Sequence, residues 1–121
     1  MKKLIKNLIY KILSYFNFGG VVILMYHSIA ENNEFFTVSP KEFEKQMAYL
    51  KNHNFNVVKL TDLPGLFKKP ILRKSLVITF DDGYEDNYLN ARPILEKYNL
   101  PATIFVSSAC IGETRRMSKG T

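Results

Sequence analysis

A short apolar run that ends on two adjacent acids constrains this chain more than any other feature. Residues 76–80 read Leu-Val-Ile-Thr-Phe, and Asp81, Asp82 and Gly83 follow directly. A continuous β-rich run of this length predicts a strand covered on both faces, as in a parallel sheet. Gly83 lets the chain turn sharply, so both carboxylates are expected at the strand end. Their mutual repulsion is costly unless a cation or a shared proton offsets it, which makes the pair a candidate site.

Strands and helices alternate along the rest of the sequence. Further apolar, β-rich runs predict strands at residues 21–26, 55–60 and 102–106. Together with the strand that carries the acids, they predict four parallel strands and an α/β fold. His27, which follows the first strand, is then expected at the same sheet edge as the acid pair.

Two helices can be placed by their start signals. Ser39 and Glu42 form a capping box with Pro40 at the first helical position, which predicts a helix that ends near residue 53. In the later helix, Pro93 fits within the first turn if Asn90 is the N-cap.

The positive charge of the chain is concentrated near its ends. With 17 Lys and Arg against 11 Asp and Glu, the formal net charge is +6. The stretch between the ends is nearly neutral and carries no nucleic-acid recognition motif, so we expect no nucleic-acid partner. The 121 residues suit one domain or part of one.

The first 18 residues combine basic charge with apolar side chains at helical spacing, which predicts an amphipathic basic helix. Its segment 2–16 suits contact with a membrane surface, and packing on its own domain is an equal alternative. Lys6 and Lys11 interrupt the apolar centre that a cleaved signal peptide needs. We therefore divide the chain into this helix, residues 1–20, and a main domain, residues 21–121.

The acid-bearing motif resembles the first signature of the polysaccharide deacetylase family, also called the NodB-homology domain or carbohydrate esterase family 4. That signature, Thr-Phe-Asp-Asp-Gly, is present at residues 79–83. The flanks are also similar to the family, at Met25-Tyr26-His27, Ser39-Pro40 and residues 101–106. The resemblance covers about residues 21–112. It implies the N-terminal part of an irregular (β/α) barrel with about seven strands and a site at their C-terminal ends.

The resemblance further implies a metal-dependent hydrolase that removes N-acetyl groups from N-acetylglucosamine-type polysaccharide or glycan. Asp81 would be the general base and Asp82 a ligand of a divalent metal, usually zinc in this family. His27 would line the site and contact substrate, and a histidine that is only hydrogen-bonded at a strand end is the alternative. Such a substrate favours a secreted or membrane-associated protein of the cell envelope, with a cytoplasmic location as the alternative.

The family takes its other zinc ligands from a His-[Ser/Thr]-x-x-His motif, and this sequence does not contain one. Its two histidines are His27 and His53. A full barrel also needs about 200 residues or more. We therefore expect a truncated deacetylase domain in which part of the site is absent and which is inactive by itself.

Two other functions remain open from the sequence. A non-catalytic domain could dock on a membrane or a partner through its basic N-terminal helix. Strand-end acids also suit Mg²⁺-dependent phosphoryl transfer. The chain lacks an Asp-x-Asp motif next to the strand and a phosphate-cradling glycine loop, which disfavours this last function.

Overall fold

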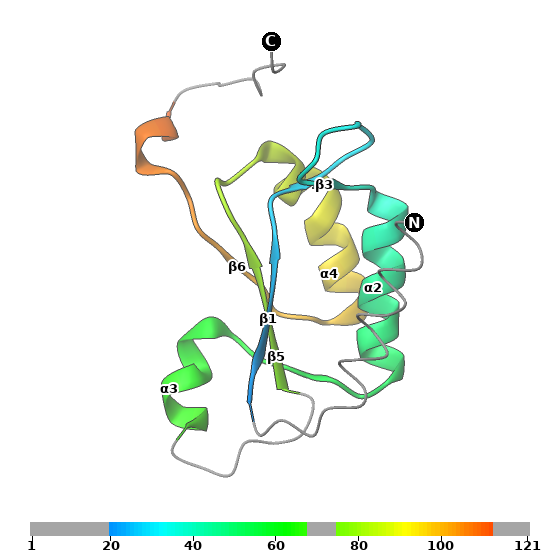
Figure 1. Ribbon diagram of the computed structural model, residues 1–121, viewed down its shortest axis with the longest axis vertical. Helices are drawn as coiled ribbons and strands as arrows, with labels where there is room; N and C mark the ends of the chain where they lie inside the picture. The colour runs from blue at the N-terminus through cyan, green and yellow to red at the C-terminus, as the bar shows by residue number, and fades with distance from the viewer. Residues whose placement is uncertain (1–19, 68–74, 113–121) are drawn as a thin grey trace.

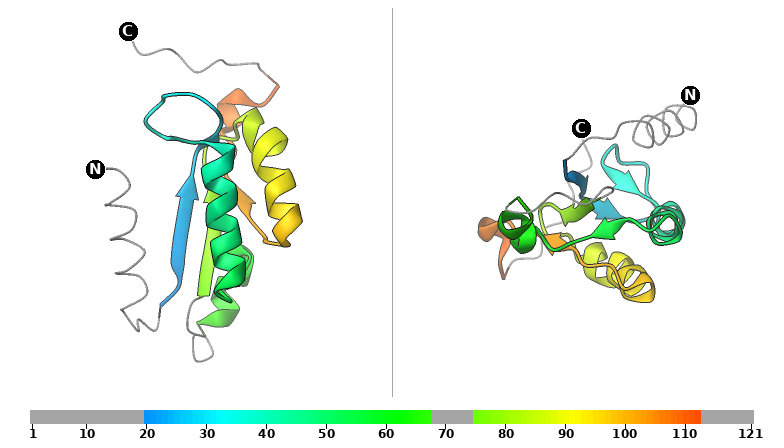
Figure 2. Two further views of the ribbon diagram at one scale, coloured as in Figure 1. Left: turned by 90° about the vertical axis from the view of Figure 1, so that its right-hand side faces the viewer. Right: turned by 90° about the horizontal axis from the view of Figure 1, so that it is seen from below.

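The computed structural model describes residues 20–67 and 75–112, which are arranged around a parallel sheet (Figure 1). Helices α2 (Pro40–Asn52) and α4 (Arg92–Tyr98) pack against each other on one side of the strands. The short helix α3 (Leu63–Leu66) lies on the opposite side (Figure 2). This layering is that of an α/β fold, as the alternation of strands and helices predicts.

The predicted amphipathic helix at residues 1–18 lies outside the described residues. The division of the chain at residue 20 and the membrane contact through residues 2–16 therefore stay predictions. Within the described ranges, no helix is long and apolar enough to cross a membrane.

Strand β5 (Ser75–Phe80) is the central strand of a four-stranded sheet. Strand β1 (Val22–Tyr26) pairs with it along one edge, and β4 (Asn56–Val57) and β6 (Thr103–Ile104) pair along the other. Every pairing is parallel, and all six residues of β5 are buried. The predictions of four parallel strands and of a central strand covered on both faces are confirmed.

Strands β4 and β6 are shorter than the predicted ranges 55–60 and 102–106. They share a single edge of β5, where β4 pairs with Ser75 and Leu76 and β6 pairs with Thr79 and Phe80. Because this edge is only six residues long, neither strand can pair along its whole length, and each pairs at two residues. An apolar run in a sequence does not reveal such sharing, since it records burial and not the pairing partner.

A second, smaller sheet was not predicted. Strands β2 (Ser28–Ile29) and β3 (Thr37–Val38) pair in parallel, and the Ala30 N–H donates a 3.1 Å hydrogen bond to the Val38 carbonyl. Strands of two residues are too short to leave a periodic pattern. This small sheet fixes the chain that follows β1.

Three aromatic rings form the centre of the core between the sheet and α2. Tyr26 lies edge-on to Phe43, with ring centroids 5.1 Å apart, and stacks on Phe80 at 5.5 Å. Phe43 and Phe80 complete the group at 5.8 Å. The Tyr26 hydroxyl keeps a polar partner, since it donates a 2.6 Å hydrogen bond to the Gln46 side chain. Tyr26 and Phe80, the last residues of β1 and β5, are thereby held in place by contacts with α2.

The predicted helix start at Ser39 is confirmed. The Ser39 side chain accepts a 3.3 Å hydrogen bond from the Glu42 N–H, and Pro40 is the first residue of α2. One face of the helix buries Phe43, Met47 and Leu50.

The helix after the acid pair starts earlier than predicted. Helical geometry begins at Glu85 and passes through a π-helical turn, η2 (Asn87–Ala91), into α4. Asn90 is therefore not an N-cap, and its amide instead donates a 2.7 Å hydrogen bond to the Ile29 carbonyl. Pro93 lacks an N–H and can continue neither the π-helical nor the α-helical hydrogen-bond pattern. The local sequence around this proline therefore predicts a helix start that is later than the one in the structure.

We expect Ser39→Ala to lower the free energy of unfolding by about 1 kcal/mol, because the Glu42 N–H loses its acceptor. Urea unfolding followed by circular dichroism measures this change. Ser39→Asp is the matched control, since aspartate caps helices as well as serine. Equal losses in both variants would show that the cap does not contribute as described.

Candidate active site

The acid pair follows a strand end that is hydrogen-bonded to both neighbouring strands. The Asp81 N–H donates a 2.9 Å hydrogen bond to the Tyr26 carbonyl, which extends the β1–β5 ladder by one residue. On the other edge, the Phe105 N–H donates a 2.8 Å hydrogen bond to the Phe80 carbonyl. The backbone that carries the acids is thus bonded to both neighbouring strands.

The turn after Asp81 is left-handed at two successive residues. Asp82 and Gly83 both have φ of +70°. Glycine adopts this conformation without cost, and aspartate is among the few other residues that tolerate it. A Cβ on Gly83 would lie 3.2 Å from the Val106 Cγ1, so the turn also runs close to the chain beyond β6. As a result, Asp81 is half-buried whereas Asp82 is exposed.

His27 lies at the same end of the sheet as the acids, where the parallel strands β1 and β5 finish. It directly follows Tyr26, whose carbonyl accepts the Asp81 N–H, and its side chain is half-buried. Its ring lies against Phe36, with centroids 5.9 Å apart and planes inclined by 51°. The structure therefore brings together the three residues predicted for the site, Asp81, Asp82 and His27.

Sequence reasoning missed a third acid, Asp86, which joins the two strand ends. One of its carboxylate oxygens accepts a 2.7 Å hydrogen bond from the Ser28 hydroxyl, and the other accepts a 2.9 Å bond from the Ile29 N–H. Asn90 holds the Ile29 carbonyl from the same helical segment. Ser28 and Ile29 are fully buried, so these bonds fix the residues next to His27. No local signal predicts contacts between residues 57 or more positions apart.

The phenol of Tyr84 stays protonated at neutral pH. Burial raises its pKa, and the carboxylates of Asp82 and Asp86 raise it further. Its ring is stacked on Phe36 with centroids 6.1 Å apart. Tyr84 therefore adds a neutral hydroxyl and an aromatic face to an otherwise acidic edge.

The donor set at this edge does not form a complete metal site. Among the described residues, no group of three or more His, Cys, Asp and Glu side chains is placed to hold a metal ion. Asp81 and Asp82 offer carboxylate oxygens, whereas a catalytic zinc ordinarily has three protein ligands. On their own, the described residues do not fit zinc.

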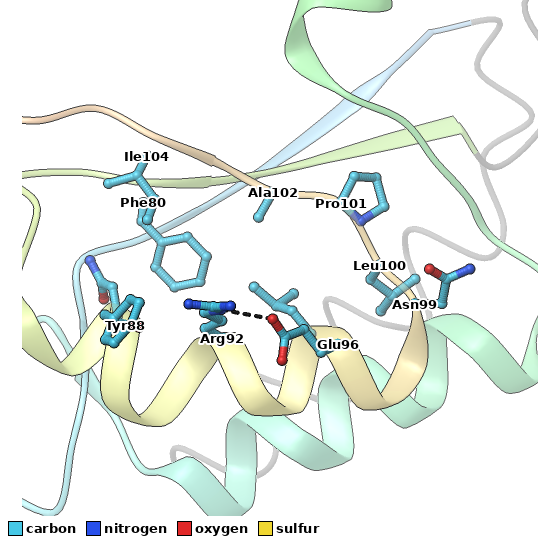
Figure 3. Close-up of a pocket in the computed structure, with 11 residues that line it drawn as sticks. Phe80, Tyr88, Arg92, Glu96, Asn99, Leu100, Pro101, Ala102 and Ile104 are labelled. Carbon is cyan, nitrogen blue, oxygen red and sulfur yellow. Dashed lines mark hydrogen bonds and ion pairs between the residues drawn. The ribbon is translucent and has the colours of Figure 1, made fainter.

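A pocket of about 390 Å³ lies elsewhere, between α4 and β6 (Figure 3). Apolar side chains such as Phe80 and Leu95 line it, together with the ion pair of Arg92 and Glu96, whose atoms are 2.7 Å apart. Asn87 also lines it, and both polar atoms of that side chain are buried without a hydrogen-bond partner among the described residues. No residue predicted for the site contributes to this pocket.

Comparison with known proteins identifies the family. Residues 68–120 match the sequence profile described as polysaccharide deacetylase. A putative polysaccharide deacetylase of Bacillus subtilis, YxkH, is 40% identical over 100 residues, which is 80% of this chain. The chain belongs to the polysaccharide deacetylase family.

Other deacetylases agree with this assignment. The poly-β-1,6-N-acetyl-D-glucosamine N-deacetylase of Staphylococcus aureus is 37% identical over 98 residues, or 80% of the chain. These matches cover 35% of the B. subtilis relative and 33% of the S. aureus enzyme. The chain therefore spans about a third of the length of these curated relatives.

Solved deacetylases share the fold. IcaB from Ammonifex degensii superposes with a TM-score of 0.73 at 27% identity, over 81% of this chain and 42% of that one. The Streptococcus pyogenes deacetylase PplD, solved in complex with acetate, gives 0.72 at 27% identity, over 80% and 47%. The predicted deacetylase-type α/β fold is thus confirmed.

Substituting Gly83 tests how tightly the turn of this deacetylase segment is packed. We expect Gly83→Ala to lower stability more than Gly112→Ala, as judged by the midpoint of urea unfolding. Both positions have positive φ and carry the same strain, about 1–2 kcal/mol, but only a Cβ at Gly83 presses on Val106. Equal midpoints would mean that the Val106 side chain moves aside freely.

Proposed function

We propose that this chain carries the acid pair of a deacetylase that hydrolyses the N-acetyl groups of an N-acetylglucosamine polymer. Its support is the placement of Asp81 and Asp82 at the end of β5, beside His27. The family membership and the activity of the S. aureus relative agree with this reaction. The backbone bond from Asp81 to Tyr26 is the observation that carries the proposal, because it fixes the acids in relation to β1.

Asp81 is the group proposed to act as general base. Hydrolysis of an acetamide requires that a water molecule adds to the carbonyl carbon while a nearby base accepts its proton. Asp81 is half-buried on an anchored backbone, so its position is defined within narrow limits. His27 lines the same edge and would contact the substrate.

Asp82 is the residue proposed to bind the divalent metal. It is exposed next to Asp81 and would supply one oxygen ligand. The remaining ligands would have to come from outside the described residues, because those residues contain no group of three suitable side chains. The full sequence contains only two histidines, His27 and His53, so we propose that the 121-residue chain by itself releases no acetate from N-acetylglucosamine oligomers. The substrate class also supports a location in the cell envelope.

Zinc titration of the chain, followed by NMR of the backbone amides, tests the role of Asp82. We expect the signals of Asp82 and Gly83 to shift with a weak affinity. Asp82→Asn should reduce this affinity by about tenfold or more, since loss of even an indirect partner of a metal costs 10–100-fold. Asparagine is chosen because it tolerates the left-handed backbone at this position.

Asp62→Asn is the matched control, since Asp62 is an exposed aspartate in the short 3₁₀-helix η1 (Leu60–Asp62). It should leave the titration unchanged. If Asp82→Asn binds zinc as the unsubstituted chain does, the metal role of Asp82 is wrong. That outcome would favour the non-catalytic domain as the function of this chain.

A further inference from the structure

Three rings from separate segments contact one another, and one of them lies near the acid pair. We call His27, Phe36 and Tyr84 the aromatic wall. His27 follows β1, Phe36 precedes β3, and Tyr84 follows the turn at the end of β5. Phe36 is the middle member, 5.9 Å from the His27 ring and 6.1 Å from the Tyr84 ring, and it is nearly parallel to Tyr84 at 15°.

The backbone around each ring is held in place. The Thr37 N–H donates a 3.1 Å hydrogen bond to the Glu34 carbonyl, so Phe36 lies in a closed turn that leads into β3. The Asn87 N–H likewise donates a 3.0 Å bond to the Tyr84 carbonyl. On the His27 side, Asp86 binds the next two residues of the chain. The wall is therefore formed before any ligand arrives, which lowers the entropy cost of binding.

The wall is also accessible, although it is apolar. Phe36 has 36% of its surface exposed and does not belong to the buried core. Tyr84 is half-buried and lies close enough to the Asp82 carboxylate for that charge to raise the pKa of its phenol. A partly exposed phenylalanine thus contacts the tyrosine that lies near the exposed acid of the candidate site.

We propose that the aromatic wall binds the apolar face of the N-acetylhexosamine unit whose acetamido group is presented to the acid pair. This inference rests on the proposed function and adds the subsite that orients the sugar. The C–H groups on one face of a pyranose ring are weakly positive and complement the negative face of an aromatic ring. The hydroxyl groups at the rim of the sugar stay in water or reach Asp82.

Phe36 is the member of this wall that is expected to make the main stacking contact. It lies between the other two rings and comes from a loop whose only other aromatic residue, Phe35, is fully exposed. Sugars without the acetamido group would keep the stacking contact but lose the contact with the acid pair.

The test uses the 121-residue chain and a short oligomer of β-1,6-linked N-acetylglucosamine, observed by NMR. Stacking is expected to move the signals of the sugar ring protons upfield and to shift the ring signals of Phe36 and Tyr84. Phe36→Leu keeps an apolar side chain of similar volume, so the fold is retained while the ring is lost. It should raise the dissociation constant about three- to tenfold.

Phe35→Leu is the matched control and should leave the dissociation constant unchanged. Equal affinities for the Phe36→Leu variant and the unsubstituted chain would overturn the proposal, as would the absence of oligomer binding at the solubility limit. In either case the zinc titration of Asp82→Asn decides separately whether the proposed function survives. Binding with signal shifts at Asp81–Gly83 but none at Phe36 would retain the function and reject the wall.

Discussion

The hydrogen bonding of β5 on both edges is the constraint on which the other features of this structure depend. One edge is paired with β1 along its length, and the other is divided between β4 and β6. A strand in this position cannot slide or rotate without breaking bonds on both sides. The acids that follow it are consequently held by the sheet, and not by contacts between their own side chains.

The helical segment after the turn extends this control to the neighbouring strand. Asp86 and Asn90 both bind the Ser28–Ile29 segment, so the chain after β1 and the chain after β5 are fixed to each other as well as to the sheet. On the helix-covered side, the Tyr26, Phe43 and Phe80 rings join the same two strands through α2. The candidate site therefore stands on a support that is polar at the strand ends and aromatic within the core.

Local patterns predicted the parts of this arrangement that depend on local chemistry. The apolar run before Asp81 predicted the central strand, and the Ser39–Glu42 pattern predicted the helix start that the structure has. The grouping of His27 with the acids followed from the rule that parallel strands end at the same edge.

The missed features all involve partners distant in sequence. The length of β4 and β6 is set by competition for one edge of β5, and the hydrogen bonds of Asp86 cross 57 or 58 positions. The sequence predicted Asn90 as a helix N-cap, because capping is recognised from neighbouring residues alone. In the structure, its amide instead donates to the Ile29 carbonyl, 61 positions away. Neither the competition nor these bonds leaves a trace in a short stretch of sequence.

The left-handed backbone at Asp82 and Gly83 has a consequence for the evolution of such chains. The turn admits glycine, asparagine and aspartate readily and most other residues only with strain. A descendant that no longer performed chemistry would still be selected, through its folding, for one of these few residues at position 82. An acid or asparagine at this position therefore reflects the shape of the turn as well as the reaction, so the pair Asp82-Gly83 is by itself an incomplete marker of activity.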